Sequence, residues 1–206
     1  MRQIFQHFDK AAIAQLPVEA FGGRIIVILS AGEVGRAADY LMRAPRIGID
    51  TETRPTFHRG AMHPVALLQV STPDTCFLFR LNRIGLPPQL VRLLSAEGPQ
   101  KIGLSLADDW HQLCRRADFQ PGNYLELQDY VKRLGVADMS LQKLYANLLG
   151  RKISKSQRLT NWEANVLTER QKVYAATDAW ACLRLYDEIN RLLTTRDFCL
   201  ITPPQP

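Results

Sequence analysis

The stretch RIGIDTET, residues 46–53, alternates its side chains as a β-strand with one buried face does. Residues two apart in a strand share a face, so Gly48, Asp50 and Glu52 point one way and the residues between them point the other. A buried carboxylate is costly unless it is paired, protonated or bound to a metal. Two carboxylates at this spacing can hold one cation between them, with room left by Gly48. Taken alone, so short a pattern is more typical of an exposed polar strand end.

Strand and helix signals alternate along the rest of the chain, which predicts an α/β protein with a mixed central sheet. Further strands are predicted at residues 23–30, 65–72, 75–81 and 101–105. Helices are predicted after Ser30 and at 87–98, 106–117, 140–150 and about 168–193, several of them with capping residues. We expect an ordered loop at 151–167, a proline-containing tail at 194–206, and one domain over residues 1–206 with its core at about 24–193.

The composition is that of a soluble globular protein, and its excess of basic residues favours a polyanionic partner. The 206 residues are 46% hydrophobic and 22% charged, which is ordinary. The net charge of +6 favours a nucleic-acid partner because phosphate contacts release counterions, although many basic proteins bind none. No apolar run reaches transmembrane length and no signal peptide is visible, so no membrane association is expected. The four cysteines are far apart and form no CxxC pair, which predicts reduced thiols and a cytoplasmic protein.

A second acidic candidate lies in KIGLSLADDWHQL, where a strand leads into a helix. The apolar stripe of that helix consists of Leu106, Trp110 and Leu113. Asp109 lies within or beside the stripe, whereas Asp108 is turned away from it. An aspartate at the edge of a buried face is a candidate ligand. Both acids fit equally well as ordinary residues of a helix N-terminus, where negative charge is favoured.

The third candidate motif lies in VYAATDAWACLRLY, within the last predicted helix. Tyr174 and Asp178 are four residues apart and therefore share a helix face. The alanines around them would let this helix approach a sheet closely. A phenol and a carboxylate are thus held side by side in a buried setting. An ordinary buried hydrogen bond between tyrosine and aspartate explains the pair as well.

Together, these motifs resemble the tyrosine-type branch of the DEDD superfamily of 3′–5′ exonucleases, which includes ribonuclease D and the Werner-type exonuclease domain. The resemblance covers about residues 24–193, and its most specific part is KSQRLTNWEANVLTERQKVYAATDA. The shared features are, in chain order, Asp50, Glu52, the strand 65–71, Asp109 in a register set by Lys101 and Leu113, and the region 155–179. The sequence departs from the family at Asn165-Val166, where Arg-Pro is frequent, and at Leu104, where His or Asn is common.

The resemblance implies a ribonuclease H-like three-layer fold and a metal-dependent 3′–5′ exonuclease. Such an enzyme hydrolyses phosphodiester bonds of DNA or RNA from the 3′ end by a two-metal mechanism and releases 5′ mononucleotides. The implied cofactors are two Mg²⁺ or Mn²⁺ ions, which oxygen ligands suit, and no small-molecule cofactor is implied. The implied catalytic residues are Asp50, Glu52, Asp109, Tyr174 and Asp178, of which the four carboxylates bind metal. Tyr174 is a poor base, since a phenol has a pKa of about 10, and is expected to orient the attacking water.

Contacts with nucleic acid are expected on both sides of these acids. Thr53, Arg54 and Phe57 follow the first motif and could touch the terminal nucleotide. Lys155 and Arg158 belong to a basic loop that could either grip the phosphate backbone or be simply solvated. The rival interpretation is a non-catalytic nucleic-acid-binding or scaffold protein, but such relatives typically lose metal ligands and all four carboxylates are present. Only a short tail follows the exonuclease region, so we expect a stand-alone exonuclease domain that acts on either DNA or RNA.

Overall fold

The computed structural model describes residues 1–56 and 63–202 and is built around a six-stranded sheet. The strand order is β2-β5-β4-β3-β6-β7. β4 runs antiparallel to both of its neighbours, and all other pairings are parallel, so the sheet is mixed as predicted. The strands are β2 (Arg24–Ile28), β3 (Arg46–Thr53), β4 (Val65–Ser71), β5 (Thr75–Phe79), β6 (Gln100–Gly103) and β7 (Tyr124–Glu126).

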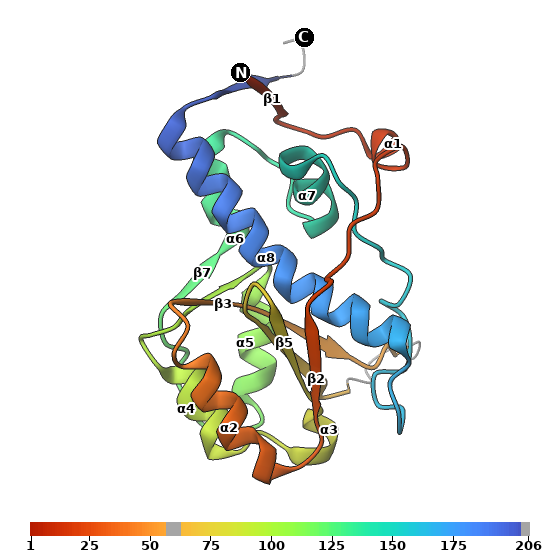
Figure 1. Ribbon diagram of the computed structural model, residues 1–206, viewed down its shortest axis with the longest axis vertical. Coiled ribbons are helices and arrows are strands. Elements are labelled where there is room, and N and C mark those ends of the chain that lie inside the picture. The colour runs from red at the N-terminus through yellow and green to blue at the C-terminus, as the bar shows by residue number, and fades with distance from the viewer. Residues whose placement is uncertain (57–62, 203–206) are drawn as a thin grey trace.

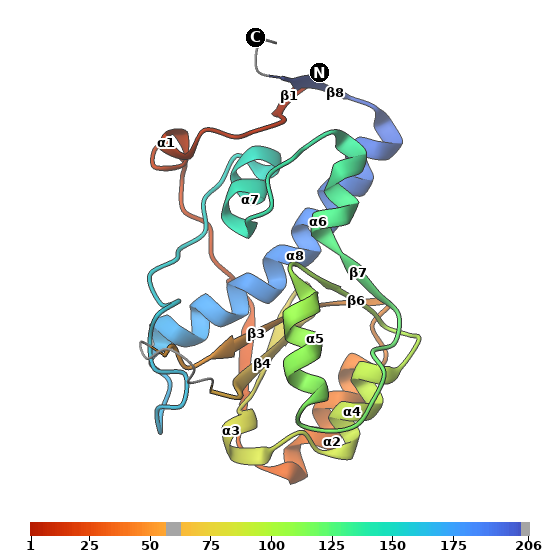
Figure 2. The ribbon, with the colours of Figure 1, turned by 180° about the vertical axis from the view of Figure 1, so that it is seen from behind.

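Helices cover both faces of this sheet and complete a three-layer architecture (Figure 1, Figure 2). One face bears α6 (Leu127–Tyr130), the 3₁₀ helix η1 (Val131–Leu134), α7 (Leu141–Leu149) and α8 (Glu169–Thr195). The other face bears α2 (Ala31–Leu41), α3 (Leu81–Ile84), α4 (Pro88–Ser95) and α5 (Leu106–Cys114). No helix of the described part of the chain is both long and apolar enough to cross a membrane.

The alternation of side chains along the strands separates the two cores. On β4, Leu67 packs toward α8, whereas Leu68 and Val70 pack toward α2, α4 and α5. On β3, Ile47 and Ile49 belong to the second core, so Asp50 faces α8. The predicted division of this strand into two faces is therefore correct, and its acidic face is the one that α8 covers.

The long helix α8 lies closely on the central strand β3. A Cβ atom at Gly48 would lie 2.0 Å from the carbonyl oxygen of Ala179, so only glycine permits this approach. Ala175 and Ala179 are fully buried, and their small side chains keep the helix near the sheet. The helix begins with the predicted capping box, in which Thr168 and Gln171 satisfy each other's backbone N–H groups.

The two ends of the chain pair with each other, which corrects the expected C-terminal tail. Phe198–Ile201 forms β8, which runs parallel to β1 (Arg2–Phe5) in a separate two-stranded sheet (Figure 2). Asn147 of α7 anchors β1: the Phe5 N–H donates to Asn147 Oδ1 at 2.9 Å, and Asn147 Nδ2 donates to the Phe5 carbonyl at 2.7 Å. The prolines of this segment argued against a helix there. They gave no sign of a strand, because the partner of β8 lies at the opposite end of the chain. The short elements α1 (Lys10–Ile13), α3, β7, α6 and η1 were also not predicted, because such short segments show no period.

Candidate active site

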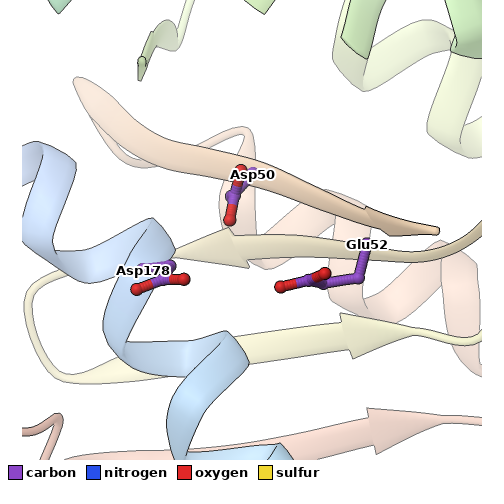
Figure 3. A group of neighbouring side chains, drawn as sticks. All are labelled: Asp50, Glu52 and Asp178. Carbon is purple, nitrogen blue, oxygen red and sulfur yellow. The ribbon is translucent and has the colours of Figure 1, made fainter. Parts of the chain in front are cut away.

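Three carboxylates meet where α8 crosses β3. Asp50 and Glu52 come from β3 and Asp178 comes from α8, and one oxygen atom of each lies within 4.8 Å of the others. Figure 3 shows the three side chains pointing toward one another. Glu52 and Asp178 are only 9% and 8% exposed. The structure thus brings together three of the four acids that the sequence singled out, and we call them the three-acid group.

The surroundings of the three-acid group disfavour its negative charges. Burial, and then the charges of Asp109 and Asp178, raise the pKa of Asp50 well above its usual range. Burial and the charges of Asp178 and Asp109 raise the pKa of Glu52 to about 9. Burial raises the pKa of Asp178 to about 7, although a hydrogen bond from the Tyr174 hydroxyl opposes the rise. A cluster of oxygen donors whose charges are only partly compensated could hold a divalent cation.

The fourth acid, Asp109, stands apart from the three-acid group. It lies on α5, and its carboxylate accepts a hydrogen bond from the Thr51 hydroxyl on the other face of β3. Burial raises the pKa of Asp109 to about 6, while the Thr51 hydrogen bond opposes the rise. Asp109 acts on the group electrostatically, because its charge raises the pKa of Asp50. The neighbouring Asp108 is exposed, as the helix pattern predicted.

Tyr174 stands one helical turn before Asp178 and is 7% exposed. Burial, and then the charges of Asp178 and Glu52, raise the pKa of its phenol, which favours the protonated hydroxyl. The fully buried Trp162 packs against the Tyr174 ring with 6.0 Å between ring centroids. Trp162 therefore anchors the loop before α8 in the core and packs against the tyrosine ring.

A cleft of about 320 Å³ opens over the three-acid group. The exposed residues Lys155 and Arg158 line it, and the charge of Arg158 acts to lower the pKa of Glu52. The basic loop therefore lies at the acids, although its contact with phosphate stays a prediction. Leu104, one of the departures from the family pattern, also lines the cleft. Sequence reasoning missed the cleft residues from the start of α7, which are Ser140, Leu141 and Gln142, because their only visible signal was that of a helix start.

The remaining predicted nucleic-acid contacts lie beyond the acids at the end of β3. Thr53 ends the strand, and Arg54 is exposed with its Nη1 atom 3.3 Å from Glu163 Oε2. His63 Nδ1 lies 3.6 Å from the other oxygen of the same carboxylate. Glu163, which the sequence did not single out, thus ties the end of β3 to the loop before α8. Phe57 lies outside the described residues.

Comparison with known proteins confirms the predicted family and fold. The sequence model of the 3′–5′ exonuclease family matches residues 27–194, so the chain belongs to the 3′–5′ exonuclease family. The chain is 33% identical over 187 residues to the mouse bifunctional 3′–5′ exonuclease/ATP-dependent helicase WRN, a match that spans 86% of this chain and 13% of WRN.

Two solved structures are similar in fold. The EXO domain of Nibbler from Aedes aegypti superimposes with a TM-score of 0.78 at 22% identity, over 88% of this chain and 95% of that domain. RNase D of Trypanosoma brucei in complex with RNA U12 gives a TM-score of 0.71 at 19% identity, over 82% of this chain and 63% of that one. The ribonuclease H-like α/β architecture expected from the sequence is therefore present.

Proposed function

We propose that this protein is a metal-dependent 3′–5′ exonuclease that hydrolyses phosphodiester bonds of DNA or RNA from the 3′ end and releases 5′ mononucleotides. The observation that carries the proposal is the three-acid group, whose oxygen atoms lie within 4.8 Å of one another beneath a cleft with two cationic residues. Membership of the 3′–5′ exonuclease family supports it. A buried acidic group of this kind is unfavourable alone and becomes favourable when a cation binds.

The donor set fits two divalent cations, Mg²⁺ or Mn²⁺. By analogy with the family, the Asp50 carboxylate would help to hold both cations. Glu52 and Asp178 would complete the first position, and Asp109 would support the second. When bound, the cations lower the pKa of the attacking water and stabilise the charge on the departing 3′ oxygen.

The residues around the acids would bind and orient the substrate. The Tyr174 hydroxyl keeps its proton, so it orients the attacking water rather than accepting a proton from it. Lys155 and Arg158 would hold the phosphates near the cleft by charge. The apolar side chains of Leu104 and Ile153 line the same cleft and would contact the sugar or base. Similarity in fold to an RNase D bound to RNA supports RNA as one substrate to test.

The test is a cleavage assay on 5′-labelled single-stranded DNA, single-stranded RNA and a duplex with a recessed 3′ end. With Mg²⁺ or Mn²⁺ we expect products that shorten one nucleotide at a time from the 3′ end of at least one substrate. Excess EDTA and the Asp178→Asn variant should abolish the products, whereas Asp108→Asn, the exposed control, should retain them. Robust cleavage in EDTA would contradict the proposal. Binding of the oligonucleotides without cleavage under any cation would favour the non-catalytic scaffold instead.

A further inference from the structure

The side chain of Gln69, in the middle of β4, is fully buried and has no partner. Its exposed fraction is 0%, and neither Nε2 nor Oε1 makes a hydrogen bond to any described residue. Buried amides are nearly always hydrogen-bonded, because an unpaired polar group loses its water without compensation. The catalytic arrangement proposed above gives this residue no role.

The strand register places Gln69 beside the three-acid group. Gln69 lies directly opposite Asp50 on β3 and opposite Leu78 on β5. Opposite residues of antiparallel strands share a face. The adjacent residues Leu68 and Val70 pack into the other core, so Gln69 faces α8, as Asp50 does.

Packing alone gives no reason for an amide at this position. The neighbours on the same face of the sheet are Leu67 and Ser71 along β4, Asp50 opposite on β3 and Leu78 opposite on β5. The two leucines are fully buried in the core beneath α8. A leucine or methionine would fill a similar volume with no polar group to satisfy. The amide therefore costs stability in the cation-free protein, and such a cost is typical of a functional group.

We propose that Gln69 is a positioning residue for Asp50: once Asp50 is ionised and holds a cation, Gln69 Nε2 donates a hydrogen bond to its carboxylate. Directly opposite Cβ atoms are about 4.5–5.5 Å apart, which a glutamine side chain can span. The inference rests on the proposed function, because it requires a cation at Asp50.

A neutral donor suits this position better than a charged one. The side chains that influence Asp50 are the acids Asp109, Asp178 and Glu52, and the Thr51 backbone supplies a hydrogen bond. A lysine in place of Gln69 would neutralise Asp50 and compete with the cation. An amide instead fixes the direction of the carboxylate and leaves its charge for the metal, as hydrogen-bond partners of metal ligands generally do.

The test compares Gln69→Leu and Gln69→Met with the wild-type protein by calorimetric titration with Mn²⁺ and by thermal unfolding in EDTA. Leu78→Met, which changes the residue directly opposite Gln69 on β5, is the control for a change in packing. We expect both Gln69 variants to keep or raise the unfolding temperature in EDTA and to bind Mn²⁺ about 10-fold or more weakly. Leu78→Met should bind Mn²⁺ like the wild type.

Each other outcome overturns a specific statement. If the wild type binds Mn²⁺ and both Gln69 variants bind it equally well, the positioning role is wrong and the proposed function stands. If both Gln69 variants unfold at lower temperature or fail to fold while Leu78→Met folds normally, Gln69 is a structural residue and the proposal is wrong. If the wild type itself binds no Mn²⁺, the proposed function fails and this inference fails with it.

Discussion

Glu52→Gln should stabilise the cation-free protein at neutral and alkaline pH, although it removes a proposed metal ligand. Burial and the charges of Asp178 and Asp109 raise the pKa of Glu52 from 4.5 to about 9. A carboxyl group whose pKa is higher in the folded state binds more protons there than in the unfolded chain. Its contribution to stability is therefore fully present below pH 4.5 and is lost as the pH rises through about 9.

The size of this effect follows from the width of that pH window. From pH 4.5 to neutral pH is about 2.5 pH units, each worth about 1.4 kcal/mol. Because Glu52 keeps its proton in the folded state and loses it in the unfolded chain over this window, the group costs about 3 kcal/mol of stability at neutral pH. Glutamine has nearly the same shape and carries no charge. The substitution also removes one of the charges that raise the pKa of Asp50, so the gain is shared with the other acids.

The assay is urea unfolding in EDTA at about pH 5, 7 and 9, followed by the fluorescence of the buried tryptophans. We expect the variant to exceed the wild type in unfolding free energy by about 3 kcal/mol at neutral pH and by more at alkaline pH. Asp108→Asn removes the same charge from an exposed position and should change little. Adding Mn²⁺ should reverse the order, because the wild type gains more from the cation. A variant that is less stable than the wild type in EDTA, or a difference that does not grow with pH, would refute the repulsion in the three-acid group.

Three further predictions concern turnover and binding. Asp109→Asn should lower steady-state turnover far more than Asp108→Asn, because the charge of Asp109 raises the pKa values of Asp50 and Glu52. Equal losses would contradict the assigned register. Changing both Lys155 and Arg158 to alanine should weaken oligonucleotide binding and lower the salt slope by about 0.7 per lost phosphate contact, whereas an unchanged slope would mean that the loop is merely solvated. Tyr174→Phe should slow single-turnover cleavage by about 10- to 1000-fold with little change in unfolding temperature. Normal turnover with a stability loss of about 1 kcal/mol would show that this hydroxyl is structural.

Five of the six strands of the main sheet and its longer helices could be predicted because their signals are local. The alternation in β3 fixes which side chains face α8, and the capping box at Thr168 fixes where that helix begins. Ser140 and Gly150 bound α7 in the same way, as N-cap and left-handed C-cap. The β1–β8 pair was missed because its two strands come from opposite ends of the chain and neither has a distinctive pattern.

The geometry of the candidate site could be predicted where two of its residues lie on the same strand or the same helix. Asp50 and Glu52 share a strand face by alternation, and Tyr174 and Asp178 share a helix face by their spacing. The sequence pattern favoured Asp109 over Asp108. It could not show that Asp109 lies apart from the other three acids, because its position depends on how α5 packs against the sheet.

Two polar residues could not be found from the sequence at all. Gln69 lies inside an apolar strand, and its significance depends on a pairing with Asp50 that only the sheet register reveals. Glu163 lies in a loop without a period, and its contacts with Arg54 and His63 depend on how that loop folds back over the end of β3. Both residues gain their meaning from contacts between segments distant in sequence.

The close approach of α8 to β3 connects the packing of this fold with its chemistry. The glycine at position 48 lets the backbone of Ala179 lie against the strand, one residue after Asp178. That approach brings Asp178 to the acids of β3 and shields all three from much of the water, which raises their pKa values. The burial that makes the three-acid group unfavourable without a cation would also increase its affinity for one, because cation binding relieves the repulsion among the carboxylates. A larger residue at position 48 would move the helix outward and weaken both effects together, so the small residues at this contact belong to the site as much as the carboxylates do.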